Sequence, residues 1–257
     1  MKLLAADVGN TETTIGLFDG DTLAEQWRVM TDVPRTPDEL ALLITQLLAA
    51  RGRAASSVNG VAIGSVVPGF TAILSEACSR ATGAPVRVID GSTPLPVRLD
   101  VEEPLGVGAD RILNTLAASQ LWHRDCIVVD FGTATTFDCI TGDGAFIGGV
   151  IAPGVQTSAQ TLFRRTAKLS ATELVPPRSA IGKRTDEAIR SGVVLGNAEL
   201  VDGIVRRLKA DWPSGNVPYV VATGGLATTF APLCQCVEKV VPELTLVGLR
   251  LAWNAVA

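Results

Sequence analysis

A carboxylate opens a short polar turn near the N-terminus, in Asp7-Val8-Gly9-Asn10-Thr11. Glycine permits backbone angles that other residues avoid, and Asn and Thr supply short polar side chains. Such a turn can point successive N–H groups at a phosphate while the carboxylate holds a cation or a water against it. The alternative is an ordinary hairpin turn whose polar side chains bond to their own backbone.

The same pattern occurs again in Asp130-Phe131-Gly132-Thr133-Ala134-Thr135-Thr136. The run Leu3–Gly9 aligns with Cys126–Gly132 at a constant offset, and a Thr-rich run and a closing glycine follow both copies. We therefore predict two halves built on one plan. Two facing hairpins of this kind can grip a nucleotide between two domains, which favours phosphate binding over a plain turn.

A third polar group stands at Gly108-Ala109-Asp110-Arg111, at the start of a predicted helix. Neighbouring side chains on a helix diverge by about 100°, so Asp110 and Arg111 can face different groups. Asp110 could accept a proton from a substrate hydroxyl while Arg111 binds an anion. The alternative is a helix-capping Asp beside a solvated Arg.

Other signatures of nucleotide binding are missing from the sequence. No G-x-x-x-x-G-K-[ST] loop occurs, and no strand leads through G-x-G-x-x-G into a helix, which argues against P-loop and Rossmann folds. Thr223-Gly224-Gly225 is a further turn with room for a ligand, but glycine pairs are common in plain turns.

Histidine and cysteine chemistry is limited in this chain. Its one histidine, His123, excludes multi-histidine metal centres, and a helix-end charge explains it better than catalysis does. Asp, Glu, Thr and backbone groups must therefore carry any catalysis. The five cysteines are odd in number and scattered, so we expect reduced packing thiols.

The composition indicates a globular protein without a basic surface. The 257 residues carry 22 Lys and Arg against 26 Asp and Glu, a formal net charge of -4, which disfavours a nucleic-acid partner. The longest strongly apolar stretch, Leu40–Ala50, falls short of the roughly 18 residues that suggest a membrane span, and no export signal precedes it. We expect a cytoplasmic protein without membrane contact.

Strands and helices alternate along the chain and predict an α/β fold. A loop that contains Pro94, Pro96 and Pro104 is the predicted domain boundary. Gly192 and Gly196 stand one turn apart on a long helix, where close approach by another backbone, of this chain or of a second copy, would offset their low helix propensity. The predicted strands are 2–7, 13–19, 22–30, 58–67, 86–89, 126–130, 135–140, 146–151 and 219–223. The predicted helices are 37–50, 70–82, one leading to 123, one ending near 166, one from 186 and one from 243.

Taken in order, these motifs resemble the type III pantothenate kinases over essentially the whole chain. The matching stretches are D-V-G-N-T at 7–11, G-A-D-R at 108–111, D-F-G-T-A-T-T-F-D at 130–138, G-G-V-I-A-P-G at 148–154, T-A-K-L at 166–169, T-G-G at 223–225 and P-E-L-T-L-V-G-L at 242–249. The resemblance implies two duplicated RNase H-like α/β domains of the actin and sugar-kinase superfamily, with a nucleotide cleft between them. We expect an N-terminal domain at 1–104 and a C-terminal domain at 105–257 that carries a homodimer interface.

The same resemblance implies ATP-dependent phosphorylation of pantothenate, the first step of coenzyme A synthesis, with Mg²⁺ and a monovalent cation, K⁺ or NH₄⁺. Asp110 would be the proton acceptor, Asp7 would face Mg²⁺ and Asp130 would hold the monovalent cation. Pantothenate would contact Gly108, Ala109, Asp110 and Arg111, and Thr185 would reach it across the dimer. ATP would contact Asp7, Val8, Gly9, Asn10, Thr11, Glu12, Thr13, Thr14 and Thr133.

This chain departs from the family pattern at four positions. Val101 and Glu103 stand where Tyr and Asn are common, Glu12 replaces a frequent Asn, and Arg184 stands where Asn often precedes Thr185. These departures put substrate affinity in question before the reaction class. Two alternatives stay open, namely a non-catalytic relative of the transcriptional accessory-factor kind and a kinase for another small hydroxylated compound.

Overall fold

The computed structural model describes residues 1–165 and 172–256. The T-A-K-L motif at 166–169 lies outside the described residues. The chain forms two compact units, Met1–Ala117 with Thr245–Ala257, and Ala118–Leu244. By this division residues 105–117 and 245–257 group with the first unit, whereas the sequence analysis expects domains at 1–104 and 105–257.

The first unit contains a five-stranded sheet of order β3-β2-β1-β4-β5. The three strands β1, β2 and β3 form the predicted antiparallel meander, while β4 and β5 run parallel to β1. Its strands are β1 (Lys2–Val8), β2 (Glu12–Asp19), β3 (Thr22–Met30), β4 (Gly60–Ser65) and β5 (Val86–Ile89), and a short β6 (Arg98–Leu99) follows along the chain.

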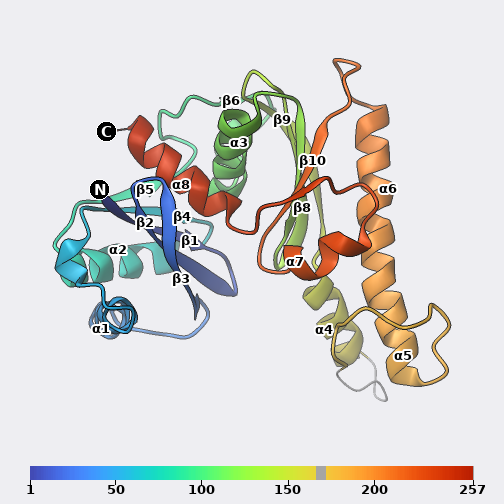
Figure 1. The fold of residues 1–257 in the computed structure, drawn as a ribbon, viewed down its shortest axis with the longest axis horizontal. Helices are drawn as coiled ribbons and strands as arrows, with labels where there is room; N and C mark the ends of the chain where they lie inside the picture. The colour runs from blue at the N-terminus through green and yellow to red at the C-terminus, as the bar shows by residue number, and fades with distance from the viewer. Residues whose placement is uncertain (166–171, 257) are drawn as a thin grey trace. The chain divides into compact units, whose positions relative to one another are not determined.

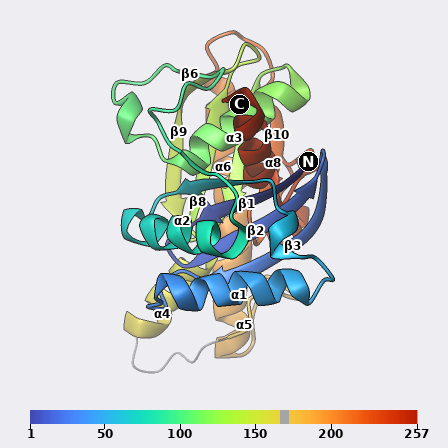
Figure 2. The ribbon, with the colours of Figure 1, turned by 90° about the vertical axis from the view of Figure 1, so that its left-hand side faces the viewer.

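Helices cover both faces of this sheet, with α1 and α2 on one side and α8 on the other (Figure 1). Strand β1 alternates accordingly: Leu4, Ala6 and Val8 enter the core under α1 and α2, whereas Leu3 and Ala5 enter the core under α3 and α8. Figure 2 views α1 and α2 in front of the strands. The helices are α1 (Pro37–Ala49), α2 (Pro68–Thr82), α3 (Ala109–Trp122) and α8 (Leu244–Ala255), with 3₁₀ turns η1 (Ala55–Ser57) and η2 (Pro104–Gly106).

The second unit repeats this strand path. Strands β7, β8 and β9 form an antiparallel meander, and β10 and β11 add parallel strands beyond β7, in the order β9-β8-β7-β10-β11. The order is that of the first unit, which agrees with the predicted duplication. The strands are β7 (Cys126–Phe131), β8 (Ala134–Ile140), β9 (Ala145–Pro153), β10 (Tyr219–Thr223) and β11 (Lys239–Val240).

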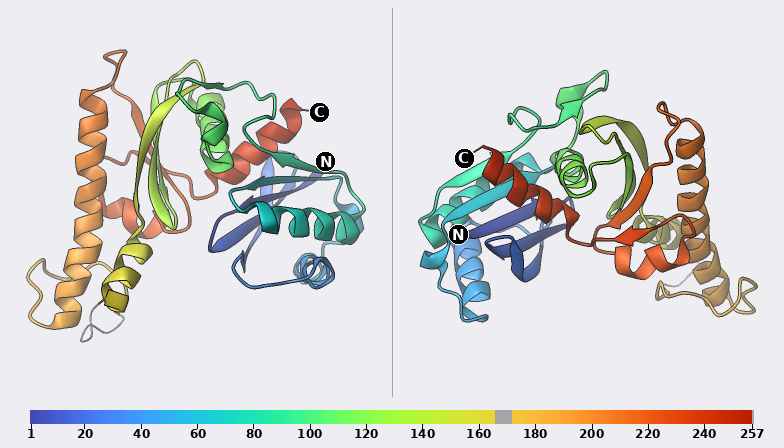
Figure 3. Two further views of the ribbon diagram at one scale, coloured as in Figure 1. Left: turned by 180° about the vertical axis from the view of Figure 1, so that it is seen from behind. Right: turned by 45° about the horizontal axis from the view of Figure 1, so that its top comes forward.

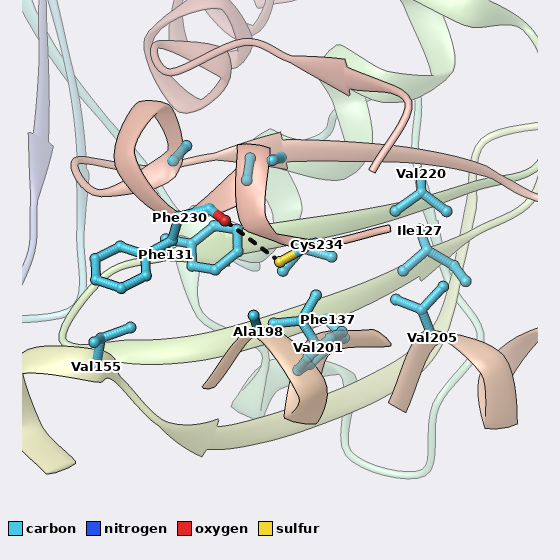
Figure 4. Close-up of a cluster of buried hydrophobic side chains, with 14 of the residues drawn as sticks. Ile127, Phe131, Phe137, Val155, Ala198, Val201, Val205, Val220, Phe230 and Cys234 are labelled. Carbon is cyan, nitrogen blue, oxygen red and sulfur yellow. Dashed lines mark hydrogen bonds between the residues drawn. The ribbon is translucent and has the colours of Figure 1, made fainter. Parts of the chain in front are cut away.

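One large apolar core holds the second unit together. Figure 4 shows part of it, with Phe131 and Phe230 stacked at 6.5 Å between ring centroids and Cys234 donating to the Phe230 carbonyl. The cysteines are free thiols, four of them buried, as expected for packing residues. The helices are α4 (Val155–Arg165), α5 (Thr185–Arg190), the π-turn η3 (Ser191–Leu195), α6 (Gly196–Ala210), α7 (Ala227–Phe230) and the 3₁₀ turn η4 (Ala231–Leu233).

The predicted long helix from residue 186 is continuous but changes its hydrogen-bonding pattern in the middle. The segment Ser191–Leu195 forms a π-turn between α5 and α6, and both views of Figure 3 show the long rod that the three elements make. Single π-turns inside α-helices are rare, and those that occur are often found at functional sites.

Candidate functional site

Asp7 occupies the carboxyl end of β1, where it pairs with Thr14 of β2. Because side chains alternate along a strand, Asp7 lies on the face that Leu3 and Ala5 share, toward α3 and α8. The turn that follows is closed by a hydrogen bond of 3.1 Å from the Gly9 N–H to the Glu12 carbonyl. This is the hairpin predicted from the sequence.

The outer arm of this turn is anchored to the segment after β3. The Thr31 N–H donates to the Thr11 carbonyl at 2.9 Å, and the hydroxyls of Thr13 and Thr31 lie 2.8 Å apart. Both hydroxyl-bearing residues are buried, so water does not compete for this bond. The exposed residues Asn10, Thr11 and Glu12 therefore stand on a fixed base.

The first turn of α3 lies over the same face of the sheet as Asp7. Asp7 pairs with Gly64 of β4. A Cβ added to Gly64 would lie 2.6 Å from Cδ1 of Leu113 and 3.9 Å from Cβ of Ala109, so α3 packs closely over this strand. The turn at Asp7–Thr14 and the segment Gly108–Arg111 are far apart in the sequence. In the structure both lie at the carboxyl end of β1 in the first unit.

Asp110 is the second residue of α3 and accepts a hydrogen bond of 2.9 Å from the Arg111 N–H. Burial raises its pKa above the ordinary value of 3.8, and the Arg111 N–H and guanidinium oppose this shift only in part. A solvated helix-capping carboxylate shows the opposite shift. Asp110 thus has the raised pKa that suits a proton acceptor, and its hydrogen bond is to the N–H of the next residue inside the helix.

The second turn is one residue shorter than the first. Phe131 pairs with Thr135, which leaves three residues between them, whereas Val8 pairs with Thr13 across four. The Gly132 N–H donates to the Ala134 carbonyl at 3.0 Å. The offset between the two copies is therefore constant through β1 and β7 but breaks in the turns.

The beginning of α4 holds this second turn in place. The Thr133 carbonyl accepts hydrogen bonds from the Gly154 N–H at 3.2 Å and from the Thr157 hydroxyl at 2.6 Å. A Cβ on Gly154 would overlap the Gly132 and Thr133 carbonyls. Thr133 itself is exposed at the tip of the turn.

Gly224 packs directly against Asp130. Thr223 of β10 pairs with Asp130 of β7, and Gly224 follows with φ of 91°, a conformation that favours glycine. An added Cβ would lie 2.9 Å from the Phe131 nitrogen and would overlap Oδ1 of Asp130. Glycine pairs are common in plain turns, so the T-G-G motif alone does not indicate this contact with Asp130.

Thr185, the residue expected to reach pantothenate, begins α5 and is exposed. The preceding Arg184, one of the departures from the family pattern, donates from Nε to Asp186 at 3.0 Å. Gly192 and Gly196 are also exposed, and a Cβ on either would meet no described atom within 4 Å. Packing within the described part of the chain thus does not explain these glycines.

The remaining departures from the family pattern lie in the Asp7–Thr14 turn and shortly before Gly108–Arg111. Glu12 is exposed at the start of β2, and strand alternation puts it on the same face as Thr14 and Asp7. Glu103 is exposed and Val101 half-buried in the loop before α3. The only tyrosine, Tyr219, lies on β10 with the Arg124 guanidinium 4.9 Å from its ring centroid.

Other potential sites are few among the described residues. A pocket of about 450 Å³, lined in part by His123, Arg124 and Asp125, lies beside the start of β7, at the other end from Asp130. His123 follows α3 with φ of 47° and donates its backbone N–H to the Ser119 carbonyl. Over residues 1–165 and 172–256, no three His, Cys, Asp or Glu side chains form a metal-binding group.

No helix in the described ranges is long and apolar enough to span a membrane.

Comparison with solved structures supports the predicted fold class. The chain is similar to a structure from Campylobacter jejuni described as a Baf family transcriptional activator, with a TM-score of 0.61 and 18% identity over 98% of this chain and 97% of the other. It is also similar to a structure from Porphyromonas gingivalis described as an N-acetylglucosamine kinase, with a TM-score of 0.51 and 12% identity over 98% and 99% of the two chains. With the repeated strand order, these similarities support the predicted fold of two α/β units built on one plan.

Sequence comparison identifies the family directly. The family model for type III pantothenate kinase matches residues 3–207. The type III pantothenate kinase of Frankia alni is 45% identical over 253 residues, which cover 98% of each protein. The chain therefore belongs to the type III pantothenate kinase family.

Proposed function

We propose that this protein transfers the γ-phosphoryl group of ATP to the primary hydroxyl of pantothenate, which yields 4'-phosphopantothenate and ADP in the first step of coenzyme A synthesis. Family membership supports the substrate and the reaction class. The observation that carries the residue roles is that Asp7 and the first turn of α3, with Asp110, lie over one face of one sheet.

Asp110 acts as the general base in this proposal. Its carboxylate accepts the proton of the substrate hydroxyl as the hydroxyl oxygen bonds to the γ-phosphorus and the bond to the leaving ADP oxygen breaks. The raised pKa of Asp110 supports this role, because a more basic carboxylate is a better proton acceptor. Gly108 and Arg111 bind the rest of pantothenate, with the Arg111 guanidinium suited to its carboxylate, whereas the buried side chain of Ala109 packs toward Gly64.

The two glycine turns bind ATP and its cations. In this proposal Gly9, the exposed Asn10, Thr11 and Glu12, Thr14 and Thr133 contact the nucleotide, whereas the buried side chains of Val8 and Thr13 support the turn. Asp7 faces Mg²⁺, and Asp130 binds K⁺ or NH₄⁺. Their carboxylate oxygens fit such hard cations, and Mg²⁺ commonly binds one or two carboxylates with phosphates and water, so a larger protein cluster is not needed. These cations supply charge stabilisation of the phosphates.

A homodimer completes the substrate site in this proposal, with Thr185 of one subunit reaching pantothenate in the other. The exposed glycines 192 and 196 support a close helix contact between two copies. A mixed dimer of one Asp110→Asn subunit and one Thr185→Ala subunit tests the arrangement. If Thr185 acts across the dimer, both lesions fall in one of the two sites and the other site keeps its activity.

A coupled assay for ADP release, with pantothenate, Mg²⁺ and K⁺, tests the proposed reaction. We expect ADP to form only when pantothenate is present. Folded protein that releases no pantothenate-dependent ADP would reject the kinase in favour of the non-catalytic alternative. A panel of other hydroxylated acids and sugars in the same assay addresses the second alternative, which Val101 and Glu103 keep open.

A further inference from the structure

The uncharged segment Ser65–Pro68 lies in contact with both the Asp7–Thr14 turn and Gly108, which precedes α3 and Asp110. The Val66 N–H donates to the Val8 carbonyl at 3.1 Å. On its other side, Cγ1 of Val66 lies 3.4 Å from the position that a Cβ on Gly108 would occupy. Oδ1 of Asp110 borders the same position, so the Val66 methyl groups and the Asp110 carboxylate flank one point beside Gly108.

The side chain of Val66 has no part in the described apolar cores. Val61 and Ile63 of β4 are buried under α1 and α2, and Val67 packs against the same core. Val66 is half-buried and belongs to none of the three core clusters of the described residues. Burial of aliphatic groups is favourable, and the Val66 methyl group beside Gly108 is therefore available to an aliphatic part of a ligand.

The chemistry of pantothenate determines which part of it reaches this point. Its phosphorylated hydroxyl is borne by a CH₂ group attached to a quaternary carbon with two methyl groups. If Asp110 takes the proton of that hydroxyl, the two methyl groups lie within three bonds of the oxygen. Beside Gly108, the atoms nearest to the position of an added Cβ belong to the Asp110 carboxylate and to a methyl group of Val66.

We propose that Val66 is a specificity-determining residue whose isopropyl group contacts the geminal methyl groups of pantothenate. This proposal rests on the proposed function and adds the residue that distinguishes pantothenate from acceptors without the methyl groups. One methylene in an apolar pocket changes selectivity by about 10- to 200-fold, and Val66 is only half-buried, so we expect an effect near the lower end.

The test measures kcat/KM for pantothenate and for an analogue in which hydrogens replace both methyl groups. Val66→Ala should lower the preference of the enzyme for pantothenate over the analogue by about 10-fold. Val66→Ile should also lower it, because the added methyl group crowds the branched carbon. The KM for ATP should change less than about twofold in both variants, since Val66 contacts the phosphate turn through its backbone.

Val67→Ala is the matched control, because it removes the same atoms from the adjacent residue, which packs into the core. It should lower the unfolding midpoint and leave the preference unchanged. An unaltered preference in both Val66 variants, or an equal change in Val67→Ala, would overturn the role of Val66. Wild-type protein that does not phosphorylate pantothenate would instead overturn the proposed function itself.

Discussion

Burial raises the pKa of Asp110, the proposed general base, so its replacement tests the mechanism directly. Replacing it with Asn preserves the side-chain oxygen that accepts the Arg111 N–H but removes the proton acceptor. We expect kcat to fall by about 10²- to 10⁴-fold, the usual contribution of general-base catalysis. In the wild type, kcat/KM should decline on the acid side at a pH above 3.8, because burial raises the pKa of this carboxyl. A wild-type rate in Asp110→Asn would remove Asp110 from the mechanism.

The stability of the same variant should change in the opposite direction. Because the folded state raises the pKa of Asp110, the folded chain binds this proton more tightly than the unfolded chain. Its contribution to stability is present below the ordinary pKa of 3.8 and is lost as the pH rises through the folded value. Asp110→Asn should therefore be at least as stable as wild type at pH 7 and gain nothing at low pH. Urea unfolding at several pH values measures this, and a large loss of stability at pH 7 would contradict it.

Gly224 makes a second residue-scale prediction. Gly224→Ala should displace the Asp130 carboxylate and destabilise the fold by more than about 1 kcal/mol, because the residue combines positive φ with a contact that excludes Cβ. If Asp130 binds the monovalent cation, the variant should also need more K⁺ for half-maximal activity.

Gly215→Ala is the control that separates the effect of positive φ from the effect of contact with Asp130 in Gly224→Ala. Gly215 has φ of 70°, and a Cβ there would meet no described atom within 4 Å. This control should lose stability through backbone strain and keep the wild-type K⁺ requirement. A K⁺ requirement that changes equally in both variants would argue against a specific effect on Asp130.

At the scale of elements, local patterns predict most of what the structure contains. Pro37 and the apolar residues that follow it at helical spacing predict α1, and the structure adds a capping box of Thr36 and Glu39 around this proline. Hairpin turns and apolar runs likewise identify β1, β2, β7 and β8. The contact of Gly224 with Asp130 joins residues far apart in the chain, so no local pattern could reveal it.

The π-turn between α5 and α6 could not be predicted from the helical stripe either, because a single inserted residue barely changes the apolar periodicity. Gly192→Leu and Gly196→Leu test what this element does. Each added side chain enters open space within the described chain and improves helix propensity by about 1 kcal/mol, so folding should not suffer. If the glycines permit close contact between two copies, both variants should shift toward monomer in light scattering. Gly69→Leu on α2, also in open space, should leave the oligomeric state unchanged.

At the scale of the molecule, the duplicated strand order does not extend to the path of the chain through the units. The first unit is discontinuous, because α8 returns to it after the whole second unit. The close fit of α8 explains why: Gly248 leaves no room for a Cβ against the Leu113 backbone, and the ring of Trp253 covers Gly60. The Arg87 guanidinium lies 4.2 Å from the centroid of that ring and donates to the Trp253 carbonyl. The first unit is therefore completed by the last residues of the chain.

Removing α8 should for this reason abolish folding of the unit that contains Asp7 and Asp110. Leu246, Leu249, Ala252 and Trp253 are buried in its core, and each large buried side chain contributes about 1.5 to 3 kcal/mol, against a total stability of about 5 to 15 kcal/mol for a domain. A chain ending at Leu244 should lose hydrogen-exchange protection in β1 and β4. Trp253→Ala should lower stability by about 3 to 5 kcal/mol, whereas Ala in place of the exposed Asn254 should have little effect. Full protection of β1 in the shortened chain would mean that the first sheet and its other helices fold without α8, contrary to the packing of this core.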